Sequence, residues 1–307
     1  MSVSSRPGRA IVFLLVAAGC LLATISVPVI WLHQVVVNTD RYVATVAPLS
    51  DDPAIKDAVA AYISDELVRL TRIDELTENR FPDGVDLLSG TAADVLRDAI
   101  YEHVRDEMDS PEFGEIWLEA NRRAHSAVTQ VVLGRDGAGA AQEGEVALNL
   151  RQLLDRIRLR LISRGFFFLK DVSLNQEASA FTVLTLPKIA TIQRAAAVLE
   201  RAALWIPLLA LACWGVAAAV CRKPRQTVLI AGLGTAAGMA FLLAGLALGR
   251  RAYLAALSQS DAVDVAAATS FFDIIINSFQ AWAWGVLAGG LAAAAIAFLL
   301  KSLSHRG

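Results

Sequence analysis

The stretch Ala10–Leu32, AIVFLLVAAGCLLATISVPVIWL, decides the fold class of this chain. Its 23 residues carry no charge, and only Pro28 interrupts its helix-forming pattern. A helix needs roughly 20 apolar residues to cross a hydrocarbon layer about 30 Å thick, so this stretch is long enough to span a membrane. Three further uncharged stretches follow it, at 202–221, 226–249 and 274–300. Polar residues open the last of them, so we expect that span to begin near Ala281.

Four such stretches, in a chain with 55% hydrophobic and only 19% charged residues, predict a membrane protein. We expect a mainly α-helical fold with four transmembrane helices and a mostly helical extracytoplasmic domain that carries a small β-ribbon. The predicted segments are 1–9 (cytoplasmic N-terminus), 10–32 (first span), 33–201 (extracytoplasmic domain), 202–221 (second span), 222–225 (cytoplasmic loop), 226–249 (third span), 250–280 (second extracytoplasmic segment), 281–300 (fourth span) and 301–307 (cytoplasmic C-terminus).

The distribution of charge predicts which side of the cell membrane each part faces. All 30 acidic residues lie between Asp40 and Asp273, whereas three short segments at the ends of the spans are basic and contain no acid. These segments hold Arg6 and Arg9, then Arg222, Lys223 and Arg225, then Lys301 and Arg306. Lys and Arg in short loops are retained in the cytoplasm, so both termini are expected there. The outer part then has 30 acidic and 21 basic residues, a net charge of −9, and we expect no nucleic-acid partner.

Two groups of residues near the outer ends of the spans bear on this topology. Arg250 and Arg251 run against the charge rule, and we expect them to extend to the headgroups or to pair with acids of the outer domain. The tryptophans near the predicted outer ends resemble an aromatic belt at a membrane surface. They are Trp31, Trp205, Trp282 and Trp284.

The first span has an alternative interpretation as a cleaved signal. Ala17-Ala18-Gly19-Cys20 resembles a lipoprotein cleavage box, which would make Cys20 a lipidated N-terminus. The chain stays apolar for a dozen residues beyond Cys20, however, so an uncleaved anchor is the preferred interpretation. Cys213 and Cys221 also lie in or at the ends of spans, so no disulfide is expected in the outer domain.

Helix start signals recur in the outer domain. Asp52-Pro53, Thr91 to Asp94 and Ser110-Pro111 each precede apolar residues at helical spacing, and Pro187 begins a stretch without a breaker into the second span. Repeated Leu and Ile predict a further helix over 151–163. Residues 145–150 and 181–186 alternate or are rich in β-formers, and we expect them to pair as the small ribbon.

One polar stripe is the candidate ligand site. Trp117, Asn121 and His125 follow one another at four-residue spacing, so they share a helix face. A pocket for a small molecule would use these groups to orient its ligand. The preferred interpretation is a buried polar network that joins this helix to a neighbour, because a lone His with an Asn lacks a nucleophile or a metal set.

Other chemistry finds little support in the sequence. His103 and Glu107 have the spacing of a two-point metal clamp, but a zinc site needs at least three protein ligands, so we predict a solvated helix face and no metal. Outside the spans, the sequence contains no motif of a nucleotide-binding, kinase or serine-hydrolase site. The motifs sought were a Walker-A loop, a dinucleotide fingerprint, a kinase set and Gly-x-Ser-x-Gly. We therefore expect a non-enzymatic protein without a catalytic residue or a cofactor.

The spans carry glycine pairs but no charged residue at mid-depth. The pairs are Gly234 with Gly238, Gly245 with Gly249, and Gly285 with Gly289. Four-residue spacing of small residues allows close helix contact, so we expect the third and fourth spans to pack tightly, with each other or across a homo-oligomer. Ion and proton pathways usually need an ionisable group inside the membrane, which argues against transport by this chain alone.

The order of features resembles a family of actinobacterial integral membrane proteins. The resemblance rests on Trp31 to Gln34, Thr39 to Val43, Asp51 to Ile55 and Trp117 to His125, and it extends over most of the chain. It implies one span, a large outer domain and three further spans, but no activity and no functional residues. Two hypotheses remain: an envelope protein whose outer domain binds a partner or lipid, and a small-molecule sensor or accessory subunit of a transport complex. An outer-facing hydrolase is the weaker third.

Overall fold

The fold is almost entirely helical in the part of the chain that the computed structural model describes. The described residues are 6–71, 86–133, 159, 162–163, 189–221, 224–258 and 264–303, and no strand occurs among them. The expected β-ribbon at 145–150 and 181–186 lies outside these residues and therefore has no structural support. The expected helix over 151–163 also lies outside them, except for residues 159, 162 and 163, which are helical.

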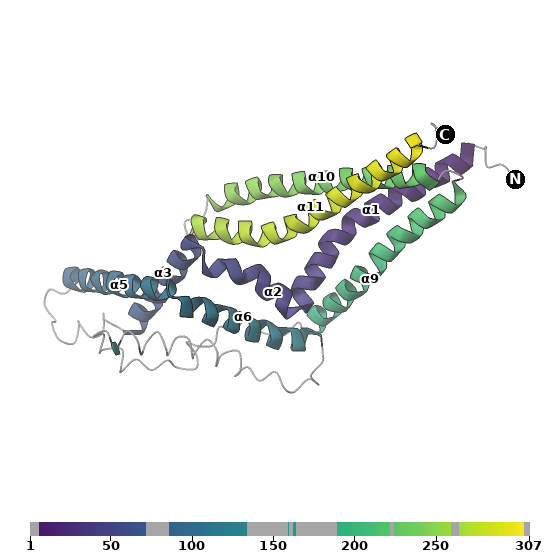
Figure 1. Cartoon of the computed structure of the whole chain (residues 1–307). Helices are drawn as coiled ribbons and strands as arrows, with labels where there is room; N and C mark the ends of the chain where they lie inside the picture. Colours follow the sequence, from purple (N-terminus) through teal and green to yellow (C-terminus); the bar gives the residue numbers. More distant parts are fainter. Residues whose placement is uncertain are drawn as a thin grey trace. The chain divides into compact units, whose positions relative to one another are not determined.

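Figure 1 shows the order of the helices along the chain. Their bounds are α1 Arg6–Val37, α2 Thr39–Val46, the 3-10 helix η1 Ala47–Ser50, α3 Pro53–Thr71, α5 Asp86–Met108, α6 Pro111–Val132, α9 Ile189–Val220, α10 Pro224–Leu257 and α11 Val265–Leu303. Two compact units form. We call Met1–Asn38, Ala190–Ser260 and Ile275–Gly307 the bundle, and Thr39–Ile189 with Asp261–Ile274 the head.

Among the described residues, four helices are long and apolar enough to cross a membrane, and they lie in the bundle except for the first turns of α11, which belong to the head. The apolar spans are Ala10–Val37, Thr191–Val220, Arg225–Leu257 and Val265–Leu300. Each is longer than the sequence segment expected for it, because α9 begins at Ile189 and α10 continues to Leu257. The start of α10 and the end of α11 lie together, since Arg225 Nη1 donates a hydrogen bond to Leu300 O at 3.1 Å.

Small residues bring the bundle helices into close contact. A Cβ added at Gly232 of α10 would lie 2.5 Å from Gly290 O of α11, so these two backbones touch. Gly234 and Gly238 lie against α1, where an added Cβ would meet Cys20 Sγ at 2.6 Å in the first case and Thr24 in the second. This close approach is what glycine permits at helix interfaces in membranes.

The head has its core between α3 and α5. Its buried side chains are Ala60, Ile63, Ile100, Val104, Met108 and Phe113, with Trp117 and Ile162 packed at the edge. Phe113 and Trp117 belong to α6, so this core also receives the first turns of α6. Burial of apolar surface of this kind stabilises a fold by about 25 cal/mol per Å².

The sequence signals predicted the starts of α3 and α6 correctly but not the start of α5. Pro53 begins α3, and Asp52 Oδ1 accepts a hydrogen bond from Ile55 N at 3.1 Å as an N-cap does. Pro111 begins α6, where Phe113 N donates to Ser110 Oγ at 3.3 Å. The prediction for α5 was wrong, because this helix begins at Asp86 and not after the signal at Thr91.

Candidate functional site

The predicted polar stripe of α6 contacts α2 and η1. Trp117 Nε1 donates a hydrogen bond to Val46 O at 3.2 Å, which ties α6 to the end of α2. Asn121 accepts a hydrogen bond at Oδ1 from the Tyr42 hydroxyl at 3.2 Å, and its Nδ2 donates to Trp117 O at 2.9 Å. Both polar ends of the Asn121 amide are therefore used within the head.

His125 completes the contact between the two helices. Its Nδ1 lies 3.1 Å from Thr39 Oγ1 on α2 and 3.2 Å from Thr129 Oγ1 one turn along α6. The imidazole ring stacks on the ring of Tyr42, with centroids 4.2 Å apart and planes 18° from parallel. Burial raises the pKa of the Tyr42 hydroxyl, which keeps it protonated as a donor to Asn121.

These contacts form what we call the α2–α6 network, made of Thr39, Tyr42, Trp117, Asn121 and His125. The three residues predicted as a ligand site all belong to it. Each of them contributes a polar atom to a hydrogen-bond contact inside the head. A ligand that used the same atoms would have to replace those contacts, and an unmade buried hydrogen bond costs about 1–3 kcal/mol.

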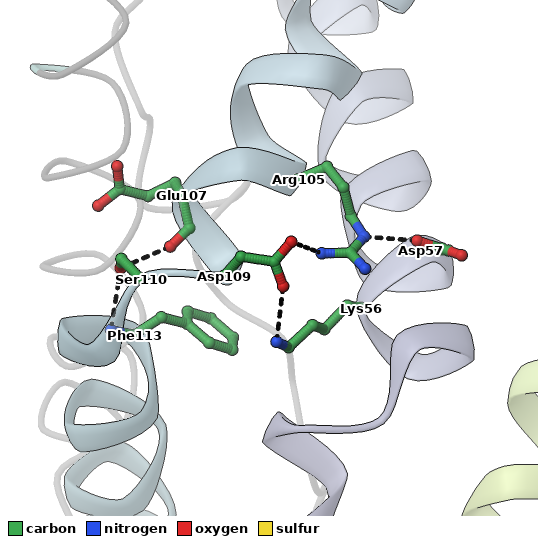
Figure 2. Close-up of polar contacts among 7 residues, drawn as sticks. All are labelled: Lys56, Asp57, Arg105, Glu107, Asp109, Ser110 and Phe113. Atoms are coloured by element: carbon green, nitrogen blue, oxygen red, sulfur yellow. Dashed lines mark hydrogen bonds and ion pairs between the residues drawn. The ribbon is translucent and has the colours of Figure 1, made fainter.

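A second polar cluster joins α3 to the end of α5 (Figure 2). Asp109 Oδ1 lies 2.8 Å from Lys56 Nζ, and Asp109 Oδ2 lies 2.7 Å from Arg105 Nη1. Arg105 Nε also contacts Asp57 Oδ1 at 2.5 Å. We call Lys56, Asp57, Arg105 and Asp109 the α3–α5 ion cluster. Its two basic side chains are the less exposed members, at 13% for Lys56 and 20% for Arg105.

The charges of this cluster shift each other's pKa values. The hydrogen bond from Arg105, followed by that from Lys56, lowers the pKa of Asp109 to about 2. The same contact with Asp109, followed by that with Asp57, raises the pKa of the Arg105 guanidinium. Burial, followed by the charge of Asp57, raises the pKa of Tyr101. Asp109 and Arg105 therefore stay charged at neutral pH, and their contacts hold the end of α5 against α3.

The sequence did not predict this cluster. Arg105 and Asp109 are four residues apart on one helix, which is a readable signal for an ion pair. Lys56 and Asp57 come from a helix about fifty residues earlier, and no spacing in the sequence links them to Asp109. The adjoining Ser110 donates to Glu107 O at 2.6 Å and caps α6, as Figure 2 shows.

His103, which the sequence offered with Glu107 as a two-point metal clamp, forms a contact within its own helix. His103 Nδ1 lies 2.8 Å from Ala99 O, one turn back on its own helix. No group of three or more His, Cys, Asp or Glu side chains that could hold a metal ion occurs within the described residues.

The glycines predicted for helix packing divide into two groups. Gly234 and Gly238 lie against α1, as described above. A Cβ added at the other four would meet nothing within 4 Å among the described residues, and these are Gly245, Gly249, Gly285 and Gly289. Sequence reasoning missed Gly232 and Gly290, the two glycines that bring α10 and α11 together, because the residue four positions after each is an alanine, Ala236 or Ala294, and only glycine–glycine pairs were considered.

The cysteine of the possible lipoprotein box is part of a helix contact. Cys20 Sγ lies 3.6 Å from Ala231 O of α10 and packs against Gly234. Its neighbour Gly19 lies under the ring of Trp214 from α9. Helices α1, α9 and α10 therefore meet at this point.

Charge on the head is unevenly distributed. Residues 40–119 contain 20 acidic and 7 basic residues, a net charge of −13, whereas residues 120–189 contain 6 acidic and 10 basic residues. On α5, Asp98, Glu102 and Asp106 follow at four-residue spacing and are exposed. We call these three the α5 acidic row. None of them has an ion-pair partner within the described residues.

Comparison with protein-family models, with curated proteins and with solved structures found no match. The function is therefore inferred from the sequence and from the geometry of the two units.

Proposed function

We propose that this protein is a non-enzymatic, multi-pass protein of the cell membrane whose outer helical domain binds a partner through its surface. Both termini lie in the cytoplasm, and residues 33–201 and 250–280 lie outside, as in the resembled actinobacterial family. Four apolar helices support the membrane location. The three basic segments without acids support the orientation.

The α2–α6 network is the main reason for proposing that the domain binds a partner with its surface and not a small molecule in a pocket. Trp117, Asn121 and His125 are the polar groups best placed to orient a small ligand, and their polar atoms contact Val46, Trp117 O and Thr39. A sensor pocket would need these groups turned towards a cavity. The accessory or sensor function therefore has less support than a function carried by the outer surface.

The charge of the domain supports a basic protein as partner over a lipid surface. A net charge of −13 over residues 40–119 is repelled by anionic headgroups and attracts basic surfaces. The α5 acidic row is exposed and adds local charge that opposes close approach to such a membrane. Binding of this kind is steered by charge, so it weakens as ionic strength rises.

Crosslinking and affinity purification of the full chain from native membranes tests the proposal. A specific basic protein should be captured at low salt by the wild-type chain and lost from the variant Asp98→Lys/Glu102→Lys. The control Asp51→Lys/Glu115→Lys makes the same change of charge at exposed positions away from α5. Capture retained in both variants contradicts the role of the acidic row, and consistent capture of a transporter would favour the accessory-subunit alternative.

A further inference from the structure

We propose that a membrane surface passes through the four tryptophans Trp31, Trp205, Trp282 and Trp284, which we call the indole belt, and that α9 and α10 continue into water beyond it. The occupant of this surface is the headgroup region of a phospholipid bilayer. The inference rests on the proposal that the four apolar helices cross the membrane. It does not depend on which side of the cell the belt faces or on any protein partner.

Contacts between the bundle helices fix their heights relative to one another. Cys20 of α1 contacts Ala231 of α10 at 3.6 Å, and the adjacent Gly19 contacts Trp214 of α9. One residue beyond Ala231, Gly232 contacts Gly290 of α11. Cys20, Trp214, Ala231 and Gly290 therefore lie at one level across the bundle, and we call it the common level.

The belt tryptophans all lie on one side of the common level, at heights between about 9 and 17 Å. A helix rises about 1.5 Å per residue, so Trp205 lies about 14 Å from Trp214 and Trp284 about 9 Å from Gly290. Trp31 lies about 17 Å from Cys20 by the same measure. A separate contact agrees, because Trp31 Nε1 donates to Ser278 Oγ at 3.3 Å, and Ser278 lies about 18 Å from Gly290 along α11.

The other ends of the helices complete a layer of bilayer thickness. Arg225 lies about 9 Å and Leu300 about 15 Å beyond the common level on the opposite side. These two residues are joined by a hydrogen bond of 3.1 Å and mark one boundary. The distance from Leu300 to Trp31 is then about 32 Å, close to the hydrocarbon thickness of a bilayer, which is about 30 Å.

The exposure of the indoles suits a lipid interface. Trp205 is 59% exposed and Trp284 is 57% exposed, and both rings lie on the outside of the bundle. An indole combines a large apolar ring with one N–H donor, so it favours the boundary between acyl chains and water. Trp214, at the common level, is instead seated over Gly19 between two helices.

The belt also accounts for the two arginines that run against the charge rule. Arg250 is 19 residues beyond Ala231, or about 28 Å, which places it about 11 Å outside the level of Trp31. Arg250 and Arg251 therefore stand in water on the continuing α10 and need not extend from a buried position. The first turns of α9 project in the same way, since Val198 lies about 24 Å from Trp214.

Fluorescence quenching in vesicles tests the belt directly. The chain has six tryptophans, and each single-tryptophan variant is made by changing the other five to phenylalanine. Vesicles contain phosphatidylcholine brominated either near the headgroup or near the bilayer centre. We expect Trp205 and Trp284 to be quenched more by the shallow bromines and Trp214 more by the deep ones. Trp214 quenched no deeper than Trp205 would overturn the proposal.

A matched pair of cysteines on one helix provides a second test. Val198 and Leu211 of α9 are 63% and 59% exposed, so the protein itself shields them equally. In nanodiscs, a membrane-impermeant maleimide should label Val198→Cys at least about tenfold faster than Leu211→Cys, because a thiol in hydrocarbon does not ionise. Wild-type chain corrects for its own three cysteines. Equal labelling of the pair would refute the boundary, and this outcome is independent of whether any protein partner is found.

Discussion

Replacing His125 with alanine removes the ring that joins α6 to the first residue of α2. The stacking on Tyr42 contributes about 0.5–1.5 kcal/mol. The hydrogen bond between His125 Nδ1 and Thr39 contributes about 1 kcal/mol more. Since His125 is only half-buried, little cavity cost is added. We therefore expect His125→Ala to destabilise the α2–α6 contact by about 2 kcal/mol.

Hydrogen exchange followed by mass spectrometry measures this loss locally. The full chain in nanodiscs is exchanged, and peptides from α2 and α6 are compared between wild type and variant. A loss of about 2 kcal/mol corresponds to roughly thirtyfold faster opening of α2. The control is Gln130→Ala, an exposed position on the same helix, where the change should stay within about 0.5 kcal/mol.

Two results would refute this reasoning. Unchanged exchange of α2 in His125→Ala would show that the network does not hold the helices together. Unchanged stability together with loss of a ligand-induced protection would make His125 a ligand-binding residue and restore the pocket hypothesis. We expect the opposite, namely lower protection and no change in any response to small molecules.

Two further changes test the packing of the bundle and the α3–α5 ion cluster. Gly232→Ala should destabilise the bundle by about 1–3 kcal/mol in thermal unfolding, because its Cβ would lie 2.5 Å from the backbone oxygen of Gly290. Gly245→Ala is the control, since its Cβ would meet nothing within 4 Å among the described residues. It should be neutral unless a second copy of the chain packs against Gly245. The lowered pKa of Asp109, about 2 against an ordinary 3.8, stabilises the folded head above about pH 4, and this contribution is lost as pH falls towards 2. The stability difference between wild type and Asp109→Asn should therefore shrink between pH 5 and pH 2, and a constant difference would contradict the ion cluster.

Local sequence signals predicted where helices of the head begin better than they predicted which helices pack together. Ser110-Pro111 placed the start of α6 correctly, because a capping hydroxyl and a first-turn proline act within one turn of the chain. The start of α5 was missed, since Gly90 lies within its second turn and reads as a breaker, at a cost of about 1 kcal/mol relative to alanine. A helix of 23 residues tolerates that cost.

A different reason explains why the sequence did not reveal which residues contact the polar stripe. Four-residue spacing fixes that Trp117, Asn121 and His125 share a face, but it does not say which helix covers that face. Thr39 and Tyr42 lie about eighty residues earlier, and nothing in their own sequence marks them as the covering residues. The same limit applies to the glycines, whose spacing predicts close contact without naming the helix in contact.

Neither polar cluster of the head includes the α5 acidic row, so these three acidic residues have no evident role in folding. The ions of the α3–α5 cluster are partly exposed, and solvent screening makes pairs of that kind contribute little, so the apolar core supplies most of the stability. The α5 acidic row has no ion pair within the described residues, and like charges four residues apart on a helix destabilise it by about 0.2–0.5 kcal/mol per pair. Asp98, Glu102 and Asp106 therefore lower the stability of α5 slightly. A charge pattern that opposes folding and faces solvent is better explained by what the surface meets outside the chain, which supports the proposed binding of a basic partner.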